Sequence, residues 1–146
     1  TDPDGRVREG GVDVLVDAIE ARSIEIGGVS FRWFRVGHVS GDGVDKPAYG
    51  IELDDGSTRV LWSGDTAFPP RWVIEAVEDP RVAMIFHECT FMPAYRGSVH
   101  THYEELCTLP EHVRERVTLM HHTEVPDGLQ LLGFAGAACR HQSFNL

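Results

Sequence analysis

The residues of this sequence that can do chemistry stand where apolar runs end. Each of four apolar runs leads within a few residues to a histidine or an acid, and the residues concerned are His38, Asp65, Glu88 and His121. Ligands gather outside the carboxyl ends of strands in sheets that are covered by helices, so four strand ends can bring dispersed side chains to one point. Imidazole and carboxylate groups together suit divalent transition metals. The pattern therefore predicts a metal centre.

Taken singly, these residues also have simpler interpretations. Asp65 follows a glycine and suits a cap for the next helix, and His38 stands in a glycine-rich stretch where exposed histidines are common. His121 and His122 point to opposite faces if their strand continues, so one of them at most faces a site. We expect His112 and His141 at the surface, and the roles of His102 and His122 stay open. The joint pattern, and not any one residue, favours the site.

The first half of the chain reads as strands. Residues 24–36 alternate apolar and polar side chains around Gly27-Gly28, which predicts a hairpin or two successive strands. Residues 37–47 are rich in glycine and aspartate and predict a loop. Two further strands, 49–54 and 58–62, flank Asp55-Gly56, a strong hairpin signal.

The first 21 residues have a less regular pattern. The polar residues 1–10 predict a flexible linker, and residues 12–21 fit a short helix or a strand equally well.

The second half alternates strands and helices. We expect a loop at 63–70, a helix at 71–78, buried strands at 82–86 and 117–120, helix at 102–116 with a break at Pro110, and a strand within 129–138. Alternation of this kind predicts an α/β fold or a layered α+β sandwich.

Composition narrows the class of protein. The chain has 146 residues, enough for a single domain, and a formal net charge of −10, which argues against general nucleic-acid binding. No apolar run approaches the length of a membrane span. The three cysteines, Cys89, Cys107 and Cys139, show no CxxC spacing and favour a reducing compartment, so we expect a cytoplasmic protein.

Four short motifs, taken in order, resemble the second half of the metallo-β-lactamase fold in its ribonuclease Z and phosphodiesterase branch. They are SGDT at 63–66, HECTF at 87–91, HTHYEEL at 100–106 and LMHH at 119–122. That branch has a strand ending in Gly-Asp-Thr, a HEAT-type motif after the next strand, a GHST-type motif that opens a helix, and a strand ending in Leu-Thr-His. His100 and Glu105 reproduce the five-residue spacing of the GHST-type motif, and the likeness covers residues 30–125. It implies half or most of an αββα sandwich.

The resemblance assigns roles to five positions. His38, Asp65 and His121 would be metal ligands, with Asp65 bridging two divalent ions, most simply Zn and alternatively Mn or Fe. Glu88 and His100 would form a carboxylate–imidazole pair beside the scissile phosphate. The implied reaction is hydrolysis of a phosphodiester by metal-activated hydroxide. Because the chain is acidic, we expect a small phosphodiester or nucleotide substrate, such as a cyclic nucleotide, before tRNA.

One family element is missing. The His-x-His-x-Asp-His loop, which supplies most of the other ligands, does not occur in this sequence. The chain is therefore either the C-terminal part of a longer enzyme, which we favour, or a relative with an incomplete site. In the first case a missing N-terminal segment, a partner chain or a second copy in a homodimer should complete the site and cover one face of the sheet.

Two other functions remain open. The same fold hydrolyses lactones, thioesters and amides, since fold does not fix the substrate. A relative with a decayed site would instead be a non-catalytic binding or assembly subunit.

Overall fold

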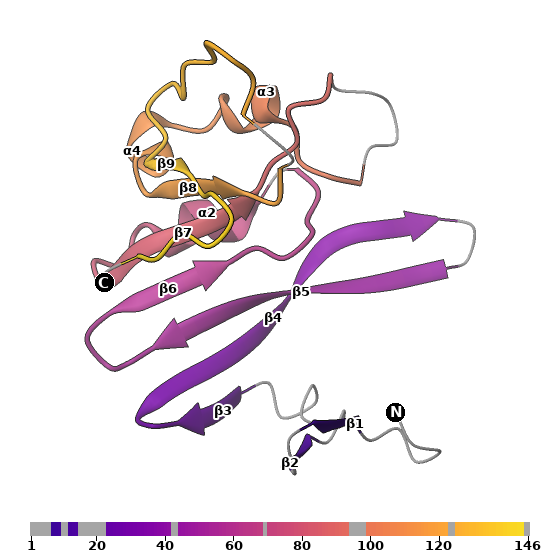
Figure 1. The fold of residues 1–146 in the computed structure, drawn as a ribbon, viewed down its shortest axis with the longest axis vertical. Helices are drawn as coiled ribbons and strands as arrows, with labels where there is room; N and C mark the ends of the chain where they lie inside the picture. The colour runs from indigo at the N-terminus through magenta and orange to yellow at the C-terminus, as the bar shows by residue number, and fades with distance from the viewer. Residues whose placement is uncertain are drawn as a thin grey trace.

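A seven-stranded sheet forms the centre of the fold (Figure 1), in a computed structural model that describes residues 7–9, 12–14, 23–41, 44–68, 70–93, 99–122 and 125–144. Its strands lie side by side in chain order. They are β3 (Ser23–Ile26), β4 (Val29–Gly41), β5 (Val44–Asp54), β6 (Arg59–Trp62), β7 (Val82–Glu88), β8 (Val117–Met120) and β9 (Gly136–Ala137). A separate two-stranded sheet pairs β1 (Val7–Glu9) with β2 (Val12–Val14).

The sheet changes character at β6. From β3 to β6 neighbouring strands are antiparallel, and from β6 to β9 they are parallel. The antiparallel half is built from hairpins, as expected from Gly27-Gly28 and Asp55-Gly56. Parallel strands need crossover connections, and here helices provide them. α2 (Arg71–Ala76) joins β6 to β7, and α3 (Tyr103–Leu106) and α4 (Glu111–Arg114) join β7 to β8. The mixed α/β class predicted from the alternation is confirmed.

The core lies between the parallel strands and these helices. Leu61, Ile85 and Leu119 of successive strands are buried against Val73 of α2, Leu106 of α3 and Val113 of α4, and all belong to one apolar cluster. Because side chains alternate along a strand, Trp62 and Phe86 lie on the opposite face, where their rings stack with centroids 5.1 Å apart. The helices therefore cover one face of β6–β8.

The opposite face carries an apolar groove of about 490 Å³. Its walls are half-buried side chains of β4, β5, β6 and β8, together with the backbone of Gly64. The lining residues are Phe31, Tyr49, Ile51, Leu53, Trp62, Gly64 and Met120. That a further segment or partner covers this face stays a prediction.

A buried ion-pair cluster ties the antiparallel half to the parallel half. Arg59 of β6 pairs with Glu52 of β5 and, at 2.6 Å, with Asp79 beyond α2. Arg32 of β4 also donates to Glu52, at 2.8 Å. Burial alone would raise the pKa of Glu52, but the hydrogen bonds and charges of Arg32 and Arg59 hold it below its ordinary value.

The main departure from expectation is the stretch 37–47, predicted as a loop. β4 continues to Gly41 and β5 begins at Val44, so most of the stretch forms a long hairpin with a register shift between Val36 and Val39. Glycine and aspartate lower β-propensity, but a paired neighbouring strand overrides it. The alternation of apolar and polar residues ends near this register shift.

Other elements also differ in extent from what the sequence predicts. The strand expected within 129–138 shrinks to β9, because the preceding residues form turns in which Gly133 has φ +82°. The residues of 12–21 that the structure describes, 12–14, are a strand, as are residues 7–9 of the expected linker; the rest of both stretches lies outside the described residues. Within the described part of the chain, no helix combines the length and the apolar character that a membrane crossing requires.

Candidate metal centre

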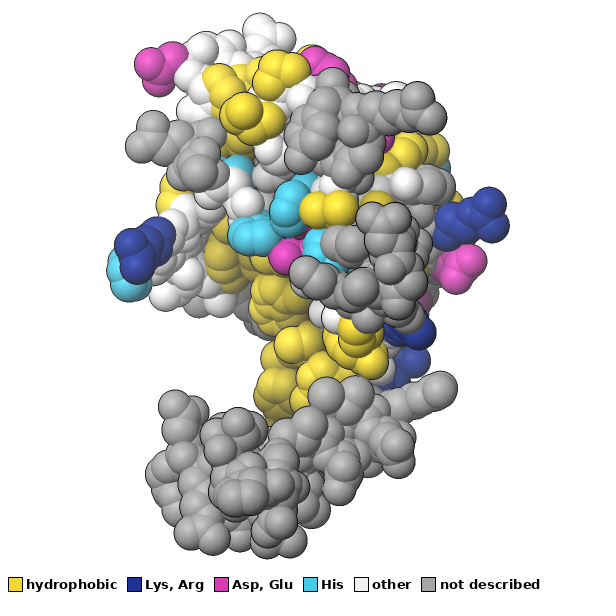
Figure 2. Space-filling model, turned by 90° about the vertical axis from the view of Figure 1, so that its right-hand side faces the viewer, with side chains coloured by type: hydrophobic (Ala, Val, Ile, Leu, Met, Phe, Trp, Pro, Cys, Tyr) yellow, Lys and Arg dark blue, Asp and Glu magenta, His cyan; other side chains and the backbone are white. Residues whose placement is uncertain are grey.

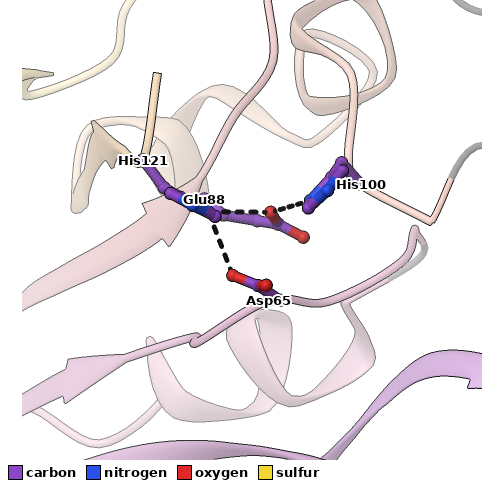
Figure 3. Close-up of side chains that lie close together, drawn as sticks. All are labelled: Asp65, Glu88, His100 and His121. Carbon is purple, nitrogen blue, oxygen red and sulfur yellow. Dashed lines mark hydrogen bonds and ion pairs between the residues drawn. The ribbon is translucent and has the colours of Figure 1, made fainter. Parts of the chain in front are cut away.

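Four side chains from separate segments converge at one edge of the sheet (Figure 3). They are Asp65 after β6, Glu88 at the end of β7, His100 before α3 and His121 directly after β8. One potential ligand atom from each of them lies within 4.8 Å of all the others. All four were predicted as site residues. They meet because β6, β7 and β8 are parallel, so their carboxyl ends share one edge.

Glu88 is the buried centre of this group. Its side chain is 2% exposed, and its Oε2 atom lies 2.7 Å from Nδ1 of His100 and 3.4 Å from Nδ1 of His121. Its other carboxylate oxygen accepts a hydrogen bond from the backbone N–H of Thr66. The backbone N–H of Glu88 donates to the hydroxyl of Ser63 at 2.8 Å. The backbone of Glu88 is thus held by Ser63 and its carboxylate by Thr66, and this carboxylate contacts both histidines.

Asp65 and His121 form the open side of the group. Nδ1 of His121 lies 3.0 Å from Oδ1 of Asp65, and the two side chains are 53% and 44% exposed. A solvent-facing carboxylate and imidazole beside a buried glutamate leave room for a substrate. Figure 2 shows this face, on which histidine side chains gather around an acidic side chain and apolar side chains surround them.

Local backbone geometry aims Asp65 and His121 into the site. Gly64 has φ +60°, and a Cβ atom there would lie 2.3 Å from the carbonyl oxygen of Tyr49, so only glycine fits. The chain turns sharply at this point, and Asp65 follows. β8 ends at Met120, and His121 has φ 58°, an uncommon value for a non-glycine residue. Strained backbone of this kind is concentrated at functional sites.

His38, predicted as a metal ligand, lies beside the group and outside it. Its ring centroid is 5.9 Å from that of His100. Its Nδ1 atom lies 3.2 Å from the carbonyl oxygen of Val99, to which it can donate. It belongs to β4, at the register shift of the long hairpin, and not to a loop. The ligand role of His38 stays a prediction.

The remaining histidines have structural places. His102 precedes α3, where its backbone N–H donates to Oε2 of Glu105 at 2.8 Å and its Nδ1 lies 2.9 Å from the Met92 carbonyl oxygen. Glu105, noted for its spacing from His100, therefore caps a helix. Partial burial lowers the pKa of His122, whose ring lies 5.3 Å from that of Phe91. His112 and His141 are exposed, as expected.

His87 has an unusual environment that the sequence did not reveal. It is fully buried, and its ring stacks on Trp72 with centroids 5.8 Å apart. Its Nδ1–H donates to the carbonyl oxygen of Glu88 at 2.7 Å, and Nε2 has no partner among the described residues. Burial lowers the pKa of His87 to about 4, and the hydrogen bond to Glu88 opposes this only in part. His87 is therefore neutral near pH 7.

The donor set fits a divalent metal ion. Two carboxylates and two imidazoles are the ligand types that Zn²⁺, Mn²⁺ and Fe²⁺ share, and they converge within coordination reach. The buried carboxylate of Glu88 faces two histidines and no arginine or lysine among the described contacts. A carboxylate-rich group of this kind gains from a cation.

Comparisons with known proteins identify a family that this chain matches. A family model described as anti-Pycsar protein Apyc1 matches residues 13–144. An anti-Pycsar protein Apyc1 of Saccharibacillus brassicae is 28% identical over 127 residues, which are 82% of this chain and 49% of that protein. The Apyc1 protein of Paenibacillus harenae is 34% identical over 86 residues, 59% of this chain and 33% of that protein. The chain thus spans about half or less of the length of these relatives.

Solved structures share the fold at low sequence identity. The metallo-β-lactamase fold protein YhfI from Bacillus subtilis has a TM-score of 0.54 at 17% identity, over 79% of this chain and 46% of that one. Unliganded yeast PDE1 has a TM-score of 0.51 at 12% identity, over 77% of this chain and 39% of that one. The metallo-β-lactamase fold expected from the four motifs is confirmed.

Proposed function

The chain belongs to the anti-Pycsar protein Apyc1 family, and from its candidate metal centre we propose that it forms part of a metal-dependent hydrolase that cleaves a phosphodiester bond in a small nucleotide. The observation that carries the proposal is the group of Asp65, Glu88, His100 and His121 with a buried carboxylate–imidazole pair inside it. We propose a cyclic nucleotide as the substrate, because the net charge of −10 disfavours a large polyanion such as tRNA.

Each residue has a proposed part. Asp65, His121 and His38 would hold the metal, and the carboxylate of Asp65 is the group that could be shared by two ions. Divalent ions bound there supply Lewis acidity towards a phosphoryl oxygen and make water a competent nucleophile near neutral pH. Zn²⁺ is the simplest choice for this donor set, with Mn²⁺ or Fe²⁺ as alternatives.

His100 is the proposed proton donor to the leaving oxygen. Nδ1–H of His100 donates a hydrogen bond to Glu88, which fixes the orientation of the ring. Nε2 is then the ring nitrogen that faces the substrate. The proposed proton donor is then Nε2–H of this ring. Glu88 therefore acts on the substrate through His100, and the hydrogen bond from Thr66 holds its carboxylate in place.

Further ligands must complete a two-ion site. Two ions occupy about eight ligand positions, water included, and the three proposed ligands Asp65, His121 and His38 supply fewer. We propose that another segment or a partner chain, which can be a second copy, supplies the rest. The apolar groove lined by Phe31, Ile51 and Trp62 offers it a surface on which to pack.

The test is elemental analysis and substrate comparison on the intact protein. We expect about two equivalents of Zn, Mn or Fe. We also expect hydrolysis of 3′,5′-cyclic nucleotides and of bis(p-nitrophenyl) phosphate, with loss on chelation and recovery on adding the metal back. Hydrolysis of a lactone or thioester in place of every phosphodiester would change the substrate class. A protein without metal or turnover would be a non-catalytic relative.

A further inference from the structure

A closed ring of hydrogen bonds joins the loop that carries Asp65 to the segment that carries His100. The backbone N–H of Thr66 donates to one oxygen of Glu88, and Nδ1–H of His100 donates to the other at 2.7 Å. Thr101, the neighbour of His100 in the chain, closes the ring, because its hydroxyl donates to the carbonyl oxygen of Thr66 at 2.7 Å. Thr66 and Thr101 are 2% and 0% exposed.

The ring matters because the His100 segment has little regular structure of its own. Residues 99–101 precede α3, and their sheet-like contacts are confined to Thr90, which donates its N–H to the carbonyl oxygen of Thr101 at 2.9 Å. The Asp65 loop likewise lies between β6 and α2. Two irregular segments can keep a fixed separation only if something joins them. Glu88 joins them through its two carboxylate oxygens, and the Thr101 hydroxyl adds a direct hydrogen bond between them where water is excluded and cannot replace it.

We propose that Thr101 is a positioning residue, whose hydroxyl sets the spacing between Asp65 and His100. The proposal rests on the proposed function, in which Asp65 holds the metal and His100 donates a proton. Thr101 touches neither substrate nor metal. It acts through Thr66 on one side and through the backbone of His100 on the other, as residues behind a metal ligand do elsewhere.

Thr101→Val removes the hydroxyl and keeps the shape of the side chain. Without the tether, the backbone that carries His100 loses its hydrogen bond to Thr66, so the imidazole samples more orientations. Loss of a partner behind the reacting groups lowers activity or metal affinity by about 10–100-fold. We expect the loss mainly in kcat, with KM nearly unchanged, because misplaced reacting groups affect the chemical step. Thr101→Ser keeps the hydroxyl and should restore most of the activity.

The deciding measurement needs neither metal nor turnover. Nδ1–H of His100, bonded to a carboxylate, should give a downfield proton signal in slow exchange in the NMR spectrum of the metal-free protein, and loss of that signal in His100→Gln identifies it. We expect the signal to broaden or disappear in Thr101→Val and to remain in Thr101→Ser. Thr118→Val is the matched control, because Thr118 is also buried, at 4% exposed, but lies in β8 outside the ring.

The outcomes separate the two proposals. An unchanged His100 signal in Thr101→Val overturns the positioning role, whatever the activity. Equal loss in Thr118→Val also overturns it, because any buried threonine would then have the same effect. A wild-type protein that shows the signal but hydrolyses no phosphodiester overturns the proposed function alone. In that case the His100 signal in Thr101→Val and Thr101→Ser still tests whether the Thr101 hydroxyl positions His100.

Discussion

Nδ1 of His100 lies 2.7 Å from Oε2 of Glu88, a contact that joins the end of β7 to the segment before α3. The glutamate is buried and the histidine is 38% exposed, so the pair runs from the interior to the surface of the site. This geometry holds one imidazole nitrogen and presents the other. It is the arrangement that the proposed proton donor needs.

Removing His100 should therefore separate chemistry from metal binding. We expect His100→Ala to keep nearly the wild-type metal content and to lower turnover by about 10²–10⁴, the usual effect of losing a positioned acid. Activated esters with a nitrophenyl leaving group should suffer less, because they need little protonation. Metal analysis and kcat on both substrate types check this. Loss of metal from His100→Ala would make it a ligand instead.

Glu88→Gln should resemble His100→Ala but be milder, because it weakens the hold on the imidazole without removing the ring. The two losses should not add, since residues that act as one unit cannot be lost twice. The double variant should therefore be close to His100→Ala in kcat. Additive losses in a double-mutant cycle would show that Glu88 acts by a separate route.

Asp65→Ala should lose metal as well as turnover. Asp65 is the exposed carboxylate of the group, 3.0 Å from His121, and Glu88 is already engaged by His100 and Thr66. No neighbouring side chain can take over a bridging position. Elemental analysis of the purified variant, beside an Asp127→Ala control at the surface, measures the loss. Full metal content in Asp65→Ala would show that Asp65 is not a metal ligand.

How much of this site the sequence predicts depends on how each residue is held. Asp65, Glu88 and His121 follow strands whose apolar character is visible in the sequence, and parallel pairing brings strand ends together. Thr101 gives no such signal, because its hydroxyl bonds to a backbone carbonyl that any residue at position 66 would offer. Contacts to the backbone leave no pattern in the partner's side chain.

The fold shows the same division. Hairpins at Gly27-Gly28 and Asp55-Gly56 have turn residues that fix them locally. The extension of β4 and β5 through 37–47 does not, because its strands are stabilised by each other and not by their own alternation. His38 was therefore placed in a loop. The ion pair of Glu52 with Arg32 also gives no signal in the sequence, since the two residues are 20 positions apart.

Glu52→Gln should destabilise the protein in a pH-dependent way. The pKa of Glu52 is held below its ordinary value, so the ion pairs contribute fully above the unfolded-state pKa and are lost as pH falls through the folded-state value. We expect the variant to lose about 1–2 kcal/mol of unfolding free energy at pH 7. That difference should shrink as the pH falls below 4.5, the ordinary pKa of a glutamate side chain. Denaturant unfolding at several pH values, with exposed Glu104→Gln as control, tests this. A constant difference would exclude the ion pairs as its cause.

His87 should weaken the metal-free fold in mild acid. Burial lowers the pKa of His87 from 6.5 to about 4, so between these values the unfolded chain binds a proton that the native one does not. Stability therefore falls as the pH drops from 6.5 to 4, by up to about 3 kcal/mol at 1.36 kcal/mol per pKa unit. His87→Phe keeps an aromatic ring against Trp72 and cannot titrate. At pH 7 the variant should be less stable, by about 1 kcal/mol, because it loses the hydrogen bond to the Glu88 carbonyl. As the pH falls, wild type should lose its advantage and become the less stable of the two, and parallel stability curves would mean that His87 is not the titrating group.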